Sequence, residues 1–402
     1  MDGPHATPVT GFVPGGSERW RDPYPMYGWL REHDPVHHVE HGDYWVLSRF
    51  ADVSAAAIDT ATFSSASGLT FTYDERRISG LDRDATPLVM MDPPEHTDFR
   101  RLLARGFTPR RVVDLEPAIR AFVVERLEGL RAAGSGDIVA DVFKPLPSFV
   151  VAHYLGVPEA DRARFDGWTD AIVAANAAGD ALSAADAVGE LVGYFAALVE
   201  QRRLDPGDDT ISDLVRLQDE GVTVSLVQIL GYAFTMIAGG NDTTTGLLGG
   251  AAVLLTSEPD QRRLLVESPE LIPGAVDELL RLTSPVQGLA RTTTREVELR
   301  ARVIPEGRKV LLLYASANRD PAEFGPTADD CDVTRGSNRH LSFGFGPHHC
   351  LGAAVAKLQA RVALEELLAR CPRFAVDAER GEYASGPFVR RHRALPFVAD
   401  TA

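Results

Sequence analysis

A single cysteine between a glycine-hinged loop and a helix is the feature that most constrains this chain, and it lies in residues 343–352, FGFGPHHCLG. Gly344 and Gly346 can take positive φ angles, which let the backbone approach a flat ligand closely. The following residues, 351–368, have helical spacing and good helix formers. Because a helix N-terminus favours a thiolate through its dipole and unpaired N–H groups, the pattern predicts that Cys350 is a metal ligand.

Two other interpretations compete for this cysteine. A free cysteine is usually a small buried apolar residue, but the two glycines, the histidine two positions earlier and the following Leu-Gly form a long composite pattern. His348, His349 and Cys350 are also potential zinc ligands. A zinc site, however, lacks a second spaced pair of Cys or His residues to complete its tetrahedron.

The pattern F-G-x-G-x-H-x-C-L-G resembles the haem-binding signature of the cytochrome P-450 superfamily. The resemblance implies that the Cys350 thiolate is the proximal ligand of the iron in haem b (iron protoporphyrin IX). It also implies a mainly α fold with a small β portion, the triangular-prism cytochrome P-450 fold, in which haem is buried between a long distal helix and the proximal cysteine loop and helix. Three segments resemble the actinobacterial P-450 family numbered 130, namely residues 151–158, 239–243 and 282–294.

Composition sets the broad class. At 402 residues, with 45% hydrophobic and 24% charged residues, the chain is ordinary for a globular enzyme. No linker, charge block or repeat divides it, so we expect one haem-thiolate monooxygenase domain over residues 1–402. The formal charge of -16 argues against nucleic acid or an anionic membrane as a partner. Three cysteines, and an N-terminus without an apolar run, predict a cytoplasmic protein without a membrane anchor.

Helical patterns dominate the chain, with strand-like pieces near each end. Helices are predicted over residues 111–132, 185–203, 225–256, 272–282 and 351–369. Strands are predicted over residues 44–47, 297–303 and 309–314, where apolar and β-branched residues alternate or run between Gly and Pro. These patterns predict a mainly α protein with a small β portion.

The apolar stretch 226–255 is long enough for a helix that crosses a domain, but its middle, residues 239–245, reads GGNDTTT. By local rules this segment is equally consistent with one helix ending and another beginning with a cap. It also resembles the P-450 oxygen-activation motif (A/G)-G-x-(D/E)-T. That resemblance implies glycines that leave room for dioxygen, with Thr243 hydrogen-bonding the iron-bound oxygen and Asp242 relaying protons.

The carboxylates of haem need cationic or donor partners, because a carboxylate that leaves water must be paired. The resemblance implies partners from three places: His96 and Arg100 in an H-x-x-x-R element, Arg291, and His348 two positions before the cysteine. His349 matches no element of the family and is expected to be solvated or packed.

Glu278 and Arg281 resemble the E-x-x-R pair of the family, although other pairs in the chain share this spacing and usually indicate a solvated helix face. Position favours this pair, because it lies in an apolar helix upstream of Cys350 and is followed by Ser-Pro. Arg335 matches the third member of the triad that fixes the cysteine loop. These three residues are expected to be structural and not catalytic.

The resemblance implies a haem-thiolate monooxygenase that inserts one atom of O2 into an apolar organic substrate of small to medium size. No G-x-G-x-x-G fingerprint or fused reductase segment is present, so a separate ferredoxin and an NAD(P)H-dependent ferredoxin reductase are expected to supply electrons. A peroxide-driven or oxidative-coupling enzyme, and a non-catalytic haem sensor or carrier, are the alternatives. The resemblance places the substrate walls at residues 69–89, 165–179, 233–239, 286–289 and 385–389.

Cations cluster in the segment that the family places on its proximal face, despite the acidic composition. The cluster comprises Arg100, Arg101, Arg105, Arg110 and Arg111, with Lys357 and Arg361 after the cysteine. These residues are predicted to steer an acidic ferredoxin to this face. The alternative is a scattered, solvated helix face.

Overall fold

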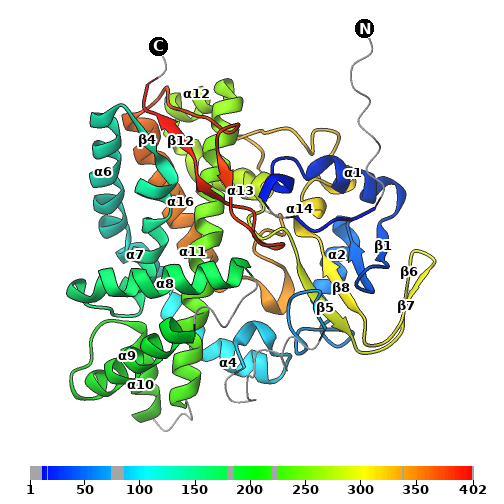
Figure 1. Cartoon of the computed structure of the whole chain (residues 1–402), viewed down its shortest axis with the longest axis horizontal. Helices are drawn as coiled ribbons and strands as arrows, with labels where there is room; N and C mark the ends of the chain where they lie inside the picture. The colour runs from blue at the N-terminus through cyan, green and yellow to red at the C-terminus, as the bar shows by residue number, and fades with distance from the viewer. Residues whose placement is uncertain are drawn as a thin grey trace.

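The computed structural model describes residues 11–15, 17–73, 86–178, 185–219, 225–336 and 339–400 of the chain. Helices fill one side and the centre of the molecule, and the largest sheet lies at the other side (Figure 1). The predicted mainly α composition with a small β portion is confirmed. Within these ranges, no helix has both the length and the apolar character that a membrane crossing requires.

The elements follow one another in a long helical series framed by strands. The helices are α1 (Tyr24–His33), α2 (Phe50–Ile58), α4 (Glu95–Leu103), α5 (Pro109–Asp114), α6 (Glu116–Ala133), α7 (Pro145–Tyr154), α8 (Arg162–Ala178), α9 (Ala185–Leu204), α10 (Thr210–Asp219), α11 (Leu226–Ser257), α12 (Pro259–Glu267), α13 (Ile272–Thr283), α14 (Tyr314–Ala317), α15 (Pro321–Phe324) and α16 (Ala353–Arg370). The strands are β1 (Val36–Val39), β2 (Tyr44–Leu47), β3 (Phe63–Ser64), β4 (Ser135–Asp137), β5 (Leu289–Thr293), β6 (Val297–Leu299), β7 (Arg302–Ile304), β8 (Lys309–Leu312), β9 (Ala375–Val376), β10 (Glu382–Tyr383), β11 (His392–Ala394) and β12 (Pro396–Val398).

The five-stranded sheet has the order β1-β2-β8-β5-β3, in which β2 and β8 are parallel and the other neighbours antiparallel. The predicted strand 309–314 is β8, although β8 ends at Leu312 and Tyr314 already belongs to α14. The register places Trp45 beside Val310 and Val310 beside Arg291. Because paired residues share a face of a sheet, Arg291 lies on the same face as Trp45. The other face packs against α1.

Two predicted elements are divided by turns that the sequence pattern does not reveal. The predicted strand 297–303 is a hairpin of β6 and β7, because Arg300 and Ala301 take φ angles of 50° and 60°. Hairpin turns of two residues usually carry Asn-Gly at such positions, so Arg-Ala gives no signal. Asp52 of α2 holds the turn by accepting a hydrogen bond of 2.6 Å from Arg300 Nε. The predicted helix 111–132 is likewise split into α5 and α6, with a proline in the first turn of α6.

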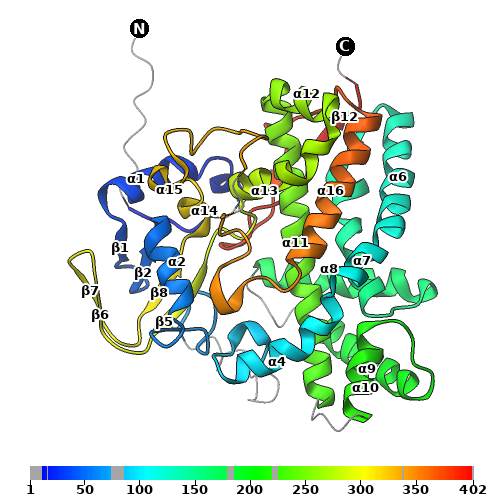
Figure 2. The same cartoon turned by 180° about the vertical axis from the view of Figure 1, so that it is seen from behind.

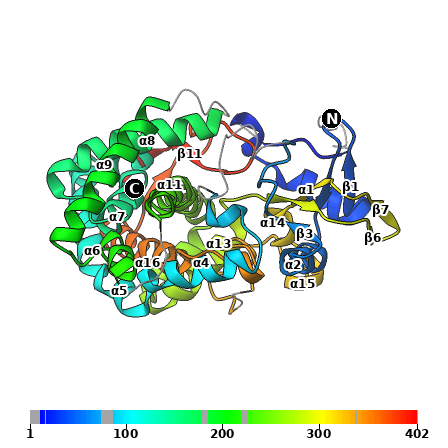
Figure 3. The ribbon, with the colours of Figure 1, turned by 90° about the horizontal axis from the view of Figure 1, so that it is seen from below.

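Helix α11 runs without interruption through Gly239 and Gly240, so the broken-helix alternative is wrong. Figure 3 views α11 end-on, with other helices around it. Ser225 caps the helix: Ser225 Oγ accepts from Gln228 N at 3.1 Å, and Gln228 Oε1 accepts from Ser225 N at 2.8 Å. Packing of the buried residues of α11 outweighs the low helix propensity of glycine, which costs about 1 kcal/mol per residue relative to alanine.

The glycines of α11 differ in how closely other segments approach them. A Cβ built on Gly246 would lie 2.7 Å from a backbone oxygen just before β11, and one on Gly250 would lie 2.6 Å from Thr283 Cγ2. A Cβ built on Gly231 or on Gly239 would meet nothing within 4 Å. The second half of α11 is therefore in direct contact with the C-terminal segment and α13, whereas space is left beside these two glycines of the first half.

Helix α16, which follows the cysteine loop, lies along α6 (Figure 2). Acids and arginines on the two helices interlock in ion pairs: Glu116, Arg120, Glu128 and Arg131 on α6, and Arg361, Glu365, Glu366 and Arg370 on α16. Between the helices, Arg120 Nη2 lies 2.7 Å from Glu365 Oε2, and Arg370 Nε lies 3.1 Å from Glu128 Oε1. Because networks of charges stabilise more than isolated exposed pairs, these contacts help to fix the direction of α16 after the cysteine.

Candidate functional site

The cysteine loop has the predicted left-handed glycines, with a φ of 69° at both Gly344 and Gly346. A Cβ on Gly346 would lie 3.1 Å from Ala57 O, so the glycine lets the loop pack directly on α2. Cys350 N donates to Phe343 O at 2.8 Å and closes the loop, and α16 begins shortly afterwards. The predicted arrangement of loop, cysteine and helix is confirmed.

The Cys350 thiol lies among protein atoms, although part of the residue is accessible. This burial raises the pKa of the thiol, while the backbone N–H of Gly352 and the Arg100 cation oppose the rise. The start of the helix therefore acts in the predicted direction, through the Gly352 N–H, while burial acts against it. A metal ion at the sulfur deprotonates a thiol outright, and the Gly352 N–H and Arg100 would then stabilise the same charge.

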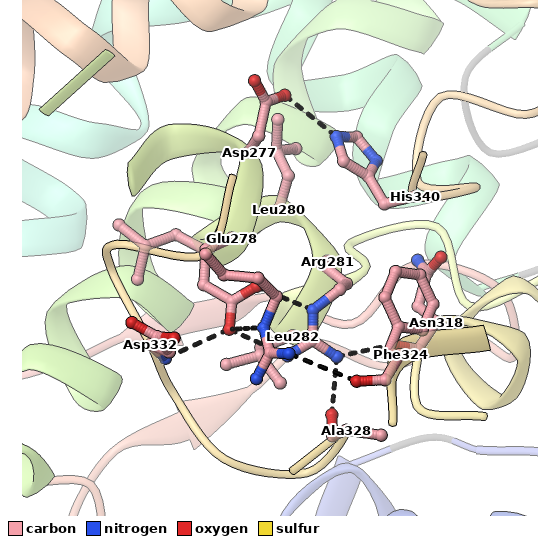
Figure 4. A network of polar contacts seen from close by, with 12 residues as sticks. Asp277, Glu278, Leu280, Arg281, Leu282, Asn318, Phe324, Ala328, Asp332 and His340 are labelled. Carbon is pink, nitrogen blue, oxygen red and sulfur yellow. Dashed lines mark hydrogen bonds and ion pairs between the residues drawn. The ribbon is translucent and has the colours of Figure 1, made fainter. Parts of the chain in front are cut away.

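A buried ion pair with complete partners holds the region before the cysteine loop (Figure 4). Arg281 donates to both carboxylate oxygens of Glu278, through Nε at 2.7 Å and Nη2 at 2.8 Å, and neither side chain is accessible. Its Nη1 donates to Asn318 O at 2.7 Å and Ala328 O at 2.5 Å. Arg335 Nε adds a bond of 3.2 Å to Glu278 Oε1, as the predicted triad requires. We call Glu278, Arg281 and Arg335 the paired network.

Buried polar contacts that no sequence motif predicted connect the paired network to the cysteine loop. Asn318 Nδ2 donates to Ser284 Oγ at 2.7 Å and to Ser342 Oγ at 2.9 Å, and its Oδ1 accepts from Leu341 N at 2.6 Å. Ser284 ends α13 in the left-handed region, with a φ of 38°. Asn318 thereby joins the end of α13 to the residues that lead into the cysteine loop.

Four basic residues that the sequence analysis selected converge beside the same loop, and we call His96, Arg100, Arg291 and His348 the basic cluster. The rings of His96 and His348 are 4.2 Å apart. Arg100 Nη2 donates to His349 O at 2.6 Å, which links α4 to the loop. Arg291 is buried and its Nη1 donates to the backbone oxygen of the preceding residue at 2.8 Å. Three separate segments therefore supply the predicted set.

Among the residues that the structure describes, no ion pair joins a member of the basic cluster to an acid, although Asp92 acts on the His96 ring electrostatically. Both ring nitrogens of His96 are buried without a hydrogen-bond partner. Burial, then the neighbouring cations of Arg291, His96 and Arg100, lowers the pKa of His348 to about 3. Burial and Arg100 also lower the pKa of His96. Buried cations and donors without acids fit a ligand that carries carboxylates.

Thr243 and Asp242 lie together on α11, between Gly239, which has space beside it, and Gly246, which is closely approached. Thr243 Oγ1 donates to Gly239 O at 2.9 Å, so the hydroxyl bridges one turn of the helix. A Cβ on Gly239 would meet no atom within 4 Å. Beside Thr243 the helix therefore presents a bare backbone and open space, as the predicted oxygen-side segment requires.

The Asp242 carboxylate is paired with a residue that the sequence analysis did not select. Arg391, which directly precedes β11, places Nε 2.6 Å from Asp242 Oδ1. Burial raises the pKa of Asp242, and the Arg391 and Lys144 cations oppose the rise. No local pattern could have identified Arg391, because it lies in the C-terminal segment, far from Asp242 in the sequence.

The structure brings two predicted wall segments together at each of two places. Phe71 lies 5.1 Å from Phe388 between ring centroids, and Val286 forms an isolated antiparallel bridge with Val389. Phe165, by contrast, is completely buried among core residues and is not a wall residue. Of the predicted walls, residues 74–85 and 179, with the side chains of residues 172–178, lie outside the described part of the structure.

The cations predicted to form a docking face differ in their pairing. Three of them are held by acids of α6, α10 and α13, namely Arg361, Arg111 and Lys357. Arg110 and Arg101 are more exposed; 92% of the Arg110 side chain is accessible and its Nε lies 3.8 Å from Asp114. The side chain of Arg105 lies outside the described residues. This face is therefore mixed in charge and not uniformly basic.

Known relatives and solved structures match this chain over almost its whole length, and a family model matches part of it. The model of the family Cytochrome P450 matches residues 183–380. Cytochrome P450 130 of Mycobacterium tuberculosis is 59% identical over 389 residues, which cover 95% of this chain and 96% of that protein. The vitamin D(3) 25-hydroxylase of Pseudonocardia autotrophica is 37% identical and covers 94% of this chain and 94% of that protein. The solved structure of CYP109Q5 from Chondromyces apiculatus has a TM-score of 0.86 and 33% identity, and covers 96% of this chain and 97% of that one.

Proposed function

Because the chain belongs to the cytochrome P450 family and is a monooxygenase of that family, we propose that it binds haem b through Cys350 and inserts one atom of O2 into an apolar organic substrate of small to medium size. The predicted fold is confirmed by the solved relatives. One observation carries the proposal: beside a loop with one cysteine, the basic cluster gathers with no described acid ion-paired to any of its members. Haem, an iron with two carboxylates, complements both features.

The residues present fit that group. Cys350 would hold the iron, and the basic cluster would hold the carboxylates; bound in this way, haem supplies the oxygen-activating chemistry. His96 can donate from a ring nitrogen that has no other partner. Arg291 is fixed by the five-stranded sheet, and Arg100 is already aligned by its bond to His349 O. A preorganised set of donors binds carboxylates with less loss of side-chain freedom.

Thr243 and Asp242 are the proposed route for protons. The Thr243 hydroxyl holds its proton toward Gly239 O and can redirect it into the space beside that glycine. The raised pKa of Asp242 brings this carboxyl nearer to neutrality, which suits a proton donor. Lys144 and Asp170 act on Asp242 electrostatically, and both side chains are about half exposed to solvent.

Electrons are proposed to come from a separate ferredoxin and its NAD(P)H-dependent reductase. Arg101 and Arg110 are the exposed cations that would meet an acidic partner.

Relatives named vitamin D(3) 25-hydroxylase and mycinamicin IV hydroxylase/epoxidase support an organic substrate. One core cluster includes residues from Val112 to Ala399, which supports a single domain over residues 1–402. The three free cysteines are consistent with a cytoplasmic protein.

The carbon monoxide spectrum of the reduced, haem-loaded protein tests the proposal. Wild type should show the red-shifted band of a thiolate-ligated haem, and Cys350→Ser should lose that band or lose haem, because a hydroxyl is a poorer iron ligand. Cys331→Ser, which changes a second free cysteine, is the matched control and should keep the band. An unchanged spectrum in Cys350→Ser would end the haem-thiolate assignment.

A further inference from the structure

The segment just before β11 crosses α11 one turn beyond Asp242. Gly246 follows Asp242 by four residues and therefore lies on the same face of the helix. A Cβ at Gly246 would lie 2.7 Å from Arg390 O and 3.3 Å from Arg391 Cβ. The segment thus rests on the bare backbone of α11, at a distance that a larger residue would prevent.

Arg390 and Arg391 point in different directions from this crossing, as neighbours in an extended segment do. Arg391 reaches Asp242, while Arg390 Nε donates to Trp20 O at 2.6 Å and its Nη2 to Tyr383 OH at 2.7 Å. Arg390 N also donates to Pro285 O at 2.8 Å. The guanidinium of Arg390 is therefore held by neutral oxygens, and it attaches the crossing segment to the N-terminal part of the chain.

Few other charges act on Asp242. The groups that face it from neighbouring elements are Arg391, Lys144 before α7 and Asp170 of α8. Lys144 Nζ and Asp170 Oδ2 pair with each other at 2.9 Å, and their side chains are 49% and 55% exposed. Since exposed, mutually paired charges are screened, Arg391 is the partner whose position decides how Asp242 is paired.

We propose that Gly246 and Arg390 are positioning residues that together hold Arg391 against Asp242, so that the N-terminal segment around Trp20 controls the pairing of the proton donor. Gly246 sets how closely the segment approaches α11, and Arg390 prevents it from turning or lifting away. The importance of this arrangement for turnover rests on the role proposed above for Asp242. The arrangement itself can be measured without turnover.

The test is an infrared titration of the Asp242 carboxyl in the haem-loaded protein, with the band identified by its loss in Asp242→Asn. In Gly246→Ala the added Cβ displaces the segment, and in Arg390→Gln the cationic anchor to Trp20 and Tyr383 is lost. Both variants should raise the pKa of Asp242 by about one pH unit or more, because a nearby cation is withdrawn. Gly231→Ala is the matched control on the same helix, with nothing within 4 Å of the new Cβ, and should titrate as wild type.

Product formed per NAD(P)H, measured against pH, separates this proposal from the proposed function. If Asp242 delivers protons, it must be protonated to act, so the alkaline limb of the profile should move to higher pH in Gly246→Ala and Arg390→Gln and should disappear in Asp242→Asn. A shifted infrared titration with an unchanged profile in Asp242→Asn would support the positioning role and overturn the catalytic one. Identical Asp242 titrations in Gly231→Ala and Arg390→Gln would overturn the positioning role, even if Gly246→Ala failed to fold.

Discussion

The paired network and the basic cluster both border the cysteine loop, yet they differ in how their charges are met. In the paired network a buried carboxylate accepts from two arginines, and further guanidinium donors reach backbone oxygens. In the basic cluster, within the described ranges, no acid pairs with any member. Because an unpaired buried cation is unfavourable, a chain retains it where a ligand supplies the missing charge. Complete pairing here indicates architecture, and incomplete pairing indicates a binding site.

The largest expected effect is in the paired network. Arg281→Ala leaves the Glu278 carboxylate buried without its main partner and should lower the free energy of unfolding by about 3–5 kcal/mol. Arg263→Ala, which removes an exposed i,i+3 partner of Asp260, should cost about 0–1 kcal/mol. Denaturant unfolding of both haem-free variants measures the difference. Similar small losses in the two variants would mean that burial of the network contributes little.

The basic cluster should show the opposite pattern. Arg291→Gln should leave the unfolding free energy of the haem-free protein unchanged or raised, because it removes a buried cation that has no acid partner. Haem should nevertheless bind about 10- to 100-fold more weakly, as expected for a lost hydrogen bond to a charged group of about 1.5–3 kcal/mol. Haem transfer to an excess of an acceptor protein measures this loss, with the exposed Arg263→Gln as the control. Lower stability combined with unchanged haem affinity would instead assign Arg291 to the architecture.

A smaller effect concerns acid stability. Burial and Arg100 lower the pKa of His96 from 6.5, so on acidification the unfolded chain takes up this proton before the folded one. The haem-free protein should therefore lose stability as pH falls below 6.5, with His96 contributing at most about 1.4 kcal/mol per pH unit. His96→Gln should make this decline shallower, and the exposed His41→Gln should not. Denaturation midpoints of the three haem-free proteins, measured across this pH range, test the prediction. Parallel plots of midpoint against pH for wild type, His96→Gln and His41→Gln would contradict the expected contribution of His96.

The smallest effect is expected at the mixed-charge face, where screening by solvent is strongest. Arg110→Glu should lower the rate of ferredoxin-dependent reduction a few-fold at low salt, and the difference should shrink as the Debye length falls to ~8 Å at physiological salt. Stopped-flow reduction by ferredoxin at several salt concentrations measures the rate and its dependence on salt. Arg263→Glu, an exposed change on α12, serves as the control. Equal sensitivity of the two variants would exclude a specific role for this face.

Sequence reasoning succeeded where the relevant information is local or carried by a family pattern. The cysteine loop and the basic cluster follow from spacings such as H-x-x-x-R and from the glycines at Gly344 and Gly346. The Asp242–Arg391 pair and the contacts of Asn318 were missed, because they join segments far apart in the chain and no short pattern encodes them. Local rules left α11 undecided, since the packing that overrides its central glycines is a tertiary effect.

The uneven contacts of α11 also have a mechanical consequence. Helix α11 is held at Gly246, where a Cβ would lie 2.7 Å from Arg390 O, whereas a Cβ at Gly231 would meet no atom within 4 Å. With a rise of about 1.5 Å per residue, the first turn of α11 lies about 30 Å from Gly246 along the helix axis, and Thr243 lies about 4.5 Å from Gly246. A tilt that displaces the first turn by about 3 Å would therefore move Thr243 by only about 0.5 Å. Because Thr243 lies so near Gly246, a small tilt of α11 about that residue would leave the Asp242–Thr243 pair almost in place.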